Sequence, residues 1–249
     1  MTELSPKPVT FILVPGAGGQ AWYWHRLVAE LEARSHTAVA VDLPASDDTA
    51  DLGVYADTIV DAAVGRDRVV LVAQSMGGFA APLACDRLSV SLLVLVNAMI
   101  PRPGETAGQW WEATGQAQAA REFAAAQGRT STGDLDLMEV FFHDVPTEVV
   151  EAAIEAGEPD QSDTPFTQPF PLDRWPDVPT RVIASRGDRL FPAEFQRRVA
   201  VERLGTTPDE VPGGHLVALA QPVPLVDRLE AYAMEVVGYH RDGFPSSTR

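Results

Sequence analysis

The chain has 249 residues, of which 45% are hydrophobic, and it carries a formal net charge of −16. This length and composition fit one α/β domain with an insertion, and the negative charge argues against partners such as nucleic acid or anionic lipid surfaces. Cys85 is the only cysteine, which excludes an intrachain disulfide. Because residues 1–8 lack a signal-peptide core and no apolar run could cross a bilayer, we expect a cytoplasmic protein that binds no membrane. The sequence leaves its oligomeric state open.

Apolar runs and amphipathic segments alternate over the first hundred residues. Short connections between such segments are typical of parallel strands joined by right-handed crossovers, with helices on both faces of the sheet. The strands are continuous apolar runs, as expected where both faces are covered. In chain order, the pattern predicts a strand over 9–16, a helix over 21–35, a strand over 37–43, a helix over 55–64, a strand over 68–73, a helix over 77–88 and a strand over 92–97.

The alternation stops after residue 100 and returns near residue 176. Between them we expect helices over 108–127, 134–142 and 147–156 and a proline-rich exit over 159–179, but no strand. We interpret residues 101–175 as a helical cap inserted into an α/β core formed by residues 1–100 and 176–249. The second part of the core is predicted to hold a strand over 181–185, a helix over 192–203, a strand over 210–211, a closing helix over 222–237 and a frayed tail from 238.

Ser75 lies in the segment VVLVAQSMGGF, where a predicted strand runs directly into a predicted helix. This is the setting of a nucleophile elbow, in which a serine occupies a strained turn. The residues two before and two after the serine must be small, and Ala73 and Gly77 fill these positions. The backbone N–H of Met76 would then point at a developing oxyanion from a helix N-terminus. A small-x-Ser-x-Gly string also occurs by chance, but the strand before it and the helix after it favour a catalytic role.

Four motifs together resemble the α/β-hydrolase superfamily over nearly the whole chain. They are PGAGG after the first strand, AQSMGG after the third, RGD after a late strand and GGH before the last helix. Within that superfamily, PGAGGQAWYW is similar to a loop of small bacterial esterases and of the plant methylesterase and hydroxynitrile lyase branch. That branch usually has histidine where this chain has Pro15. The resemblance implies an α/β-hydrolase fold, a mostly parallel sheet flanked by helices, and a serine hydrolase.

The base and the acid of such an enzyme follow the serine in the order acid, then histidine. His215, in the glycine-containing loop VPGGHL, and Asp188, just past a strand end, satisfy this order. A carboxylate at that place could fix the tautomer of the imidazole. The alternatives are that His215 only caps structure, and that Asp188 is a turn residue paired with Arg186 or Arg189.

Other candidates fit less well. His25 and His36 precede the serine and His240 lies in the tail, whereas Asn97, at the other acid position of the superfamily, cannot supply a charge. We therefore predict the triad Ser75, Asp188 and His215.

The loop over residues 15–19 should supply the second oxyanion donor. The resemblance assigns this role to the N–H of Ala17, with Gly16 as the alternative. PGAGG lacks the Lys-Ser/Thr ending of a phosphate loop and the full GxGxxG pattern of a dinucleotide site. A nucleotide site is therefore rejected, and the predicted triad mechanism implies no metal or organic cofactor.

Aromatic residues of the inserted segment are candidates for a substrate pocket. Gly16, Trp110, Trp111, Phe142 and His143 could line an apolar acyl or aryl site, although aromatic residues in helices more often pack against a core. The segment suggests a small or medium-sized apolar ester as substrate.

Other functions on the same fold stay open. Thioesterases, lactonases, amidases and C–C bond hydrolases share the triad, and some members of the superfamily are small-molecule receptors. A hydroxynitrile lyase is disfavoured, because the resemblance would require a lysine near the histidine and Lys7 is the only lysine.

Overall fold

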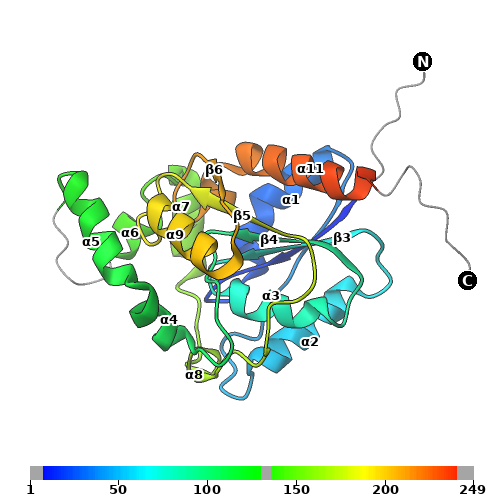
Figure 1. Ribbon diagram of the computed structural model, residues 1–249. Coiled ribbons are helices and arrows are strands. Elements are labelled where there is room, and N and C mark those ends of the chain that lie inside the picture. The colour runs from blue at the N-terminus through cyan, green and yellow to red at the C-terminus, as the bar shows by residue number, and fades with distance from the viewer. Residues whose placement is uncertain (1–7, 130–135, 240–249) are drawn as a thin grey trace, which may run out of the picture.

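The computed structural model describes residues 8–129 and 136–239 (Figure 1). Its centre is a sheet of six parallel strands in the order β2-β1-β3-β4-β5-β6. This confirms the predicted α/β fold. The strands are β1 (Thr10–Val14), β2 (Thr37–Ala40), β3 (Val69–Gln74), β4 (Val90–Val96), β5 (Thr180–Ser185) and β6 (Asp209–Val211).

Helices cover both faces of the sheet (Figure 1). One face carries the 3₁₀ helix η1 (Ala21–Trp24) with α1 (His25–Ala33), α10 (Val217–Ala220) and α11 (Pro222–Tyr239). The other carries α2 (Leu52–Ala63), α3 (Gly77–Cys85) and α9 (Ala193–Leu204).

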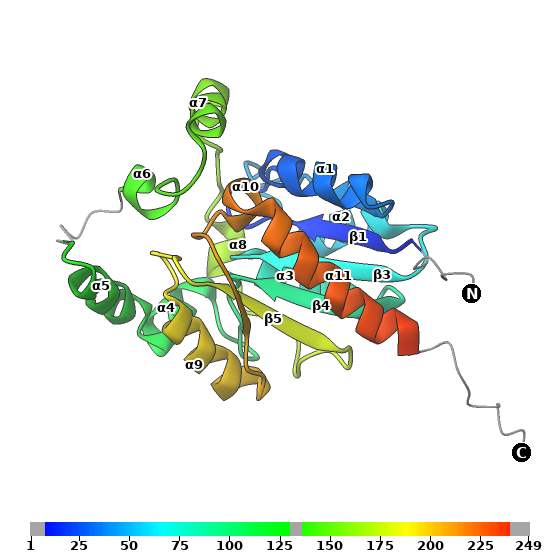
Figure 2. The ribbon, with the colours of Figure 1, turned by 90° about the horizontal axis from the view of Figure 1, so that it is seen from above.

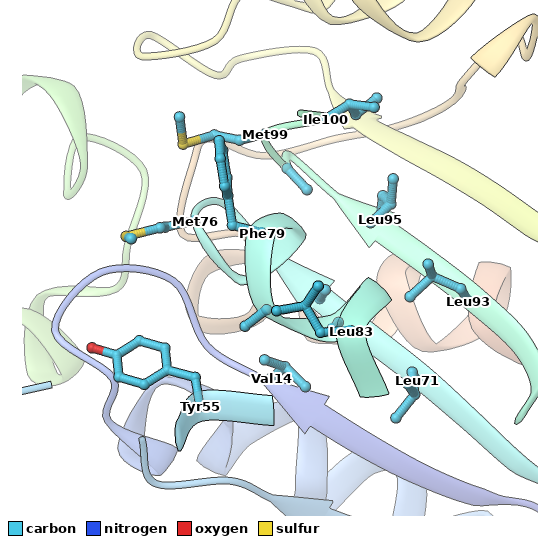
Figure 3. Close-up of a cluster of buried hydrophobic side chains, with 14 of the residues drawn as sticks. Val14, Tyr55, Leu71, Met76, Phe79, Leu83, Leu93, Leu95, Met99 and Ile100 are labelled. Atoms are coloured by element: carbon cyan, nitrogen blue, oxygen red, sulfur yellow. The ribbon is translucent and has the colours of Figure 1, made fainter. Parts of the chain in front are cut away.

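Strands β1 to β5 divide their side chains between two hydrophobic clusters. In β3, Leu71 and Ala73 join the cluster under α2 and α3, whereas Val70 and Val72 join the cluster under α1 and α11. Figure 3 shows part of the first cluster, with strand residues such as Leu71 lying beside α3. Continuous apolar strands are therefore required, because successive residues face opposite covered sides.

The strand order creates a switch point between β1 and β3. From β1 the chain passes to one face, through η1 and α1, and from β3 it passes to the other face, through α3. The loops after these two strands therefore separate at their carboxyl ends, where open α/β sheets bind ligands. Ser75 and the 15–19 loop both lie at this point.

Several boundaries differ from the predictions. Helix α2 begins earlier than expected, at Leu52, because the Asp51 side chain accepts a hydrogen bond from the Val54 N–H and caps the helix. Helix α11 extends to Tyr239, into the predicted tail, the rest of which lies outside the described residues. Among the described residues, no helix has both the length and the apolar character needed to cross a membrane.

Residues 101–175, called the insert below, connect β4 to β5. The predicted helix over 108–127 is broken at Gly115, whose φ of 65° ends one helix before the next begins. The predicted helix over 134–142 starts outside the described residues and is short within them. The insert holds α4 (Ala107–Thr114), α5 (Gln116–Ala126), α6 (Leu137–Val140), α7 (Thr147–Ala156) and α8 (Thr164–Thr167), and its described part contains no strand. Figure 2 shows α5, α6 and α7 beyond one end of the sheet.

Candidate active site

Ser75 occupies a strained turn between β3 and α3. Its φ of 50° lies in the left-handed region, which a non-glycine residue adopts only when its surroundings enforce it. Backbone carbonyl groups of two neighbouring segments lie close to the start of the helix that follows this turn. A Cβ at Gly77 would lie 2.7 Å from the Pro15 carbonyl oxygen, and one at Gly78 would lie 1.9 Å from that of Met99. The small residue predicted at position 77 is therefore required by space, and Gly78 is equally confined.

His215 and Asp188 are joined by a hydrogen bond. His215 Nδ1 lies 2.8 Å from Asp188 Oδ2, and the two residues are 1% and 0% exposed. The other carboxylate oxygen, Oδ1, accepts the backbone N–H groups of Leu190 (2.9 Å) and Phe191 (2.8 Å). A buried carboxylate with these donors can hold the imidazole in one tautomer.

The arginines beside Asp188 do not pair with it. Within the described residues, His215 is the only ion-pairing group within 4.0 Å of this carboxylate, and Arg189 donates to the carbonyl oxygen of Glu139 instead. The alternative of a turn aspartate neutralised by its neighbours is therefore not what this structure shows.

Ser75 and His215, both in the described part of the chain, form no hydrogen bond with each other. The two segments meet through the neighbouring residue, since Gln74 Nε2 lies 3.4 Å from the His215 carbonyl oxygen. Catalytic hydrogen bonds are often long before a ligand binds. The structure thus brings the predicted acid and base together, and the segment of the predicted nucleophile contacts the loop of the predicted base through Gln74.

A buried polar network supports the loop that carries His215, and the sequence analysis did not find it. Asn97 is fully buried with a φ of 46°, and its Nδ2 lies 3.1 Å from the Gly214 carbonyl oxygen and 3.2 Å from that of His215. Its Oδ1 accepts from Gln196 Nε2 at 3.2 Å, and the same Nε2 lies 3.3 Å from Asp188 Oδ2. The only sequence signal for this network is a polar residue, Asn97, at the end of an apolar strand, and the absence of a charge there says nothing of its hydrogen bonds.

The loop after β1 is fixed by the insert. The Gly18 N–H donates to Gln161 Oε1 at 2.8 Å, and the Gly19 N–H donates to the Gly16 carbonyl oxygen at 3.2 Å. For the N–H groups of Ala17 and Met76, by contrast, the described residues provide no hydrogen-bond acceptor. These two groups, both predicted as oxyanion donors, are therefore available to a ligand. Gln161 was not predicted.

A cavity of about 430 Å³ lies between the β1 loop and the insert. Gly16 and Phe142, two of the predicted pocket residues, line it. Its walls come from the loop after β1, from η1, from the end of β3, and from the segments around α6, α7 and α10: Pro15, Gly16, Ala17, Gly18, Gln20, Trp22, Tyr23, Gln74, Leu137, Met138, Phe142, Ala153, Ile154, Ala156, Gly157, Glu158, Pro159, Leu216 and Leu219.

Trp110, Trp111 and His143 do not line this cavity, which corrects the pocket prediction for them. Trp110 is fully buried, and its Nε1 donates to the Ile100 carbonyl oxygen at 3.1 Å. The Trp111 ring packs against that of Phe191, with centroids 5.4 Å apart. The tryptophans of α4 therefore face the core, where large aromatic rings gain most from burial.

His143 and Asp144 lie against the loop that carries His215. Asp144 Oδ2 accepts the Gly214 N–H at 2.6 Å, and a Cβ at Gly214 would lie 2.7 Å from His143 Cε1. Burial lowers the pKa of His143, and the nearby Asp144 carboxylate partly offsets this effect. The insert thus makes direct contact with the loop of the predicted base.

Comparisons with known proteins agree with this architecture. The chain belongs to the Alpha/beta hydrolase family, whose model matches residues 11–228. It is 38% identical over 104 residues to Methylesterase 7 of Arabidopsis thaliana, an alignment that covers 36% of this chain and 40% of that protein. It is 26% identical over 253 residues to an alpha-hydroxynitrile lyase of the same plant, covering 90% of this chain and 97% of the relative.

Among solved structures, polyneuridine aldehyde esterase superposes with a TM-score of 0.71 at 22% identity, covering 91% of this chain and 100% of that chain. The match to the esterase relative in sequence spans about two fifths of that relative's length.

Proposed function

We propose that this protein is a serine hydrolase that cleaves a small or medium-sized apolar carboxylic ester, with Ser75, His215 and Asp188 as its catalytic triad. The observation that carries the proposal is the buried hydrogen bond between His215 and Asp188, together with the contact of the His215 loop with Gln74, the residue before the strained turn of Ser75. Relatives that are named methylesterase and esterase support the same reaction class.

In the proposed reaction, the Ser75 hydroxyl attacks the ester carbonyl while His215 Nε2 takes its proton. Asp188 accepts the Nδ1–H and stabilises the imidazolium that forms. The N–H groups of Ala17 and Met76 donate to the oxyanion. His215 then protonates the leaving alcohol, and a water molecule, activated by the same imidazole, hydrolyses the acyl-enzyme and restores Ser75.

The cavity favours an apolar, uncharged group of the substrate. Side chains such as Met138, Phe142 and Leu219 form its walls, and in the described part of the chain no Lys, Arg or His lines it. An apolar group gains free energy by leaving water for such a site, whereas a carboxylate would lose its hydration without a cation in return. Thioesters, lactones and C–C bonds next to a carbonyl could be attacked by the same groups.

A fluorophosphonate probe tests the nucleophile. We expect covalent labelling of the wild-type protein and none of Ser75→Ala, because only an activated serine reacts.

A screen of p-nitrophenyl esters of increasing acyl length, with a thioester, a lactone and a hydroxynitrile alongside, tests the reaction class. The absence of both labelling and turnover in the wild type would refute the proposal and favour a receptor. Cyanide release without ester cleavage would favour a lyase.

A further inference from the structure

Gln74, the residue before Ser75, places a polar group in a largely apolar cavity. It is 4% exposed and lines the cavity described above. Its Nε2 makes one long hydrogen bond, 3.4 Å from the His215 carbonyl oxygen. Within the described part of the chain, no hydrogen bond is formed by its Oε1.

The carboxamide of Gln74 therefore has unused hydrogen-bonding capacity. Such a group offers two donor hydrogens and an acceptor oxygen, and buried polar atoms in folded proteins nearly always have partners. The His215 carbonyl oxygen does not depend on Gln74, because Asn97 Nδ2 lies closer to it, at 3.2 Å. Because Gln74 lines the cavity, its remaining hydrogen-bonding capacity is available to a ligand bound there.

The carboxamide of Gln74 lies close to the proposed nucleophile, in a tightly packed part of the site. A Cβ at Gly16 would lie 2.6 Å from Gln74 Oε1 and 2.7 Å from Ser75 Cβ. The carboxamide, the nucleophile and the loop of the Ala17 N–H thus meet around one glycine. A ligand group that reaches Gln74 must lie within a few bonds of the carbonyl under attack.

The charge around the cavity limits the kind of group. Glu158 lines it, the described residues contribute no cationic side chain to it, and the whole chain carries a net charge of −16. An anion is therefore disfavoured. A hydroxyl both donates and accepts, which matches a carboxamide with both capacities free.

We propose that Gln74 is a specificity-determining residue, and that the substrate is an uncharged ester with a hydroxyl group two or three bonds from the reacting carbonyl. This inference rests on the function proposed above. A site built to bind a hydroxyl discriminates against the analogue that lacks it, because its own polar group is then left unpaired.

Matched ester pairs test this discrimination. One pair carries the hydroxyl three bonds from the carbonyl carbon (methyl 3-phenylpropanoate and methyl 3-hydroxy-3-phenylpropanoate), and the other carries it two bonds away (ethyl 3-phenylpropanoate and ethyl 2-hydroxy-3-phenylpropanoate). Both pairs are assayed with the wild type, with Gln74→Met, which keeps the length of the side chain, and with Gln116→Met. Gln116 is a suitable control because it is 5% exposed, bonds to the Leu190 carbonyl oxygen and does not line the cavity.

We expect the wild type to favour the hydroxylated member of one pair by at least about 10-fold in kcat/KM. Gln74→Met should reduce this ratio to about 2-fold or less, mainly by slowing the hydroxylated ester, while Gln116→Met keeps the wild-type ratio. Equal rates within both pairs in the wild type, or an unchanged ratio in Gln74→Met, would overturn the inference. Hydrolysis of the plain esters in that case would leave the proposed function intact.

A binding measurement covers the cases in which turnover fails. Calorimetric titration of the four esters into Ser75→Ala and into Ser75→Ala/Gln74→Met needs no catalysis. The role of Gln74 is supported if a hydroxylated ester binds more tightly than its plain analogue to Ser75→Ala but not to Ser75→Ala/Gln74→Met. Equal binding of the two esters to Ser75→Ala refutes it. If Gln74→Met does not fold, as judged by circular dichroism, Gln74→Leu replaces it in both assays.

Discussion

In α2, which covers the sheet, five residues are buried, whereas α7 of the insert buries only Val149 and leaves Ile154 67% exposed. Helix α6 buries none. The core helices are thus held by the hydrophobic effect, since each removes an apolar stripe from water. The same effect contributes much less to holding α6 and α7.

Around α6 and α7, polar contacts tie the insert to the core, and they end on the loops of the proposed active site. Asp144 binds the Gly214 N–H, Gln161 binds the Gly18 N–H, and Glu139 accepts from Arg189. These contacts reach the loops of the proposed base, oxyanion donor and acid, respectively. The core therefore fixes where the proposed reacting groups lie, and the insert contacts their loops and forms part of the cavity wall.

The largest expected effect lies in the core. Ser75→Ala and His215→Ala should each lower kcat/KM for ester hydrolysis by at least about 10³-fold, because the nucleophile or its base is lost. Steady-state kinetics on a p-nitrophenyl ester measures this loss. The exposed histidine His25 gives a matched control, and His25→Ala should stay within about 2-fold of the wild type. Near-normal activity of His215→Ala would show that His215 is not the catalytic base.

The stability difference between the regions can be measured with one type of substitution. Ile59→Ala in α2 removes a fully buried side chain and should lower the free energy of unfolding by about 2–5 kcal/mol. Ile154→Ala in α7 removes an exposed one and should change it by no more than about 0.5 kcal/mol. Because Ile154 lines the cavity, its loss should instead raise KM for apolar esters. Urea denaturation and kinetics together test the comparison, which fails if both variants lose equal stability.

The next largest effect on activity is expected when the hydrogen bond between Asp144 and the Gly214 N–H is removed. Asp144→Ala should lower kcat by about 10- to 100-fold with little change in KM, because the loop of His215 loses a fixed backbone hydrogen bond. Asp144→Asn keeps an acceptor oxygen and should recover most of the activity. The control is Asp136→Ala, which removes another aspartate of the insert, one that caps α6. Equal losses of kcat in the two alanine variants would show that Asp144 has only a general structural role.

The sequence predicted the parts of the site that depend on local pattern. The strand–turn–helix segment around Ser75 follows from apolar runs and small residues, and the glycines before His215 mark a loop. The contacts that tie the insert to the core join residues 70 and 143 positions apart, and no local pattern encodes such pairs. The pattern does not separate the two alternatives for Trp110 and Trp111, because an aromatic residue on a helix has the same pattern whether it faces a core or a ligand.

The smallest expected effect concerns His143 and the pH dependence of stability. Burial lowers the pKa of His143 below the ordinary value of 6.5. The unfolded chain therefore binds this proton at a higher pH than the folded chain does. The free energy of unfolding should fall as the pH drops through about 6.5, and it should level off only below the pKa of the folded state.

His143→Gln should flatten this dependence, because an amide takes up no proton in either state. Urea denaturation between about pH 5 and pH 8 measures the slope, and His25→Gln, at an exposed site, should keep the wild-type slope. A steeper loss of stability in His143→Gln at low pH would mean that the folded state gains from protonating His143, through an ion pair with Asp144, whose Oδ1 lies 3.9 Å from the ring Nε2. The insert would then be held to the loop of His215 by charge rather than by packing.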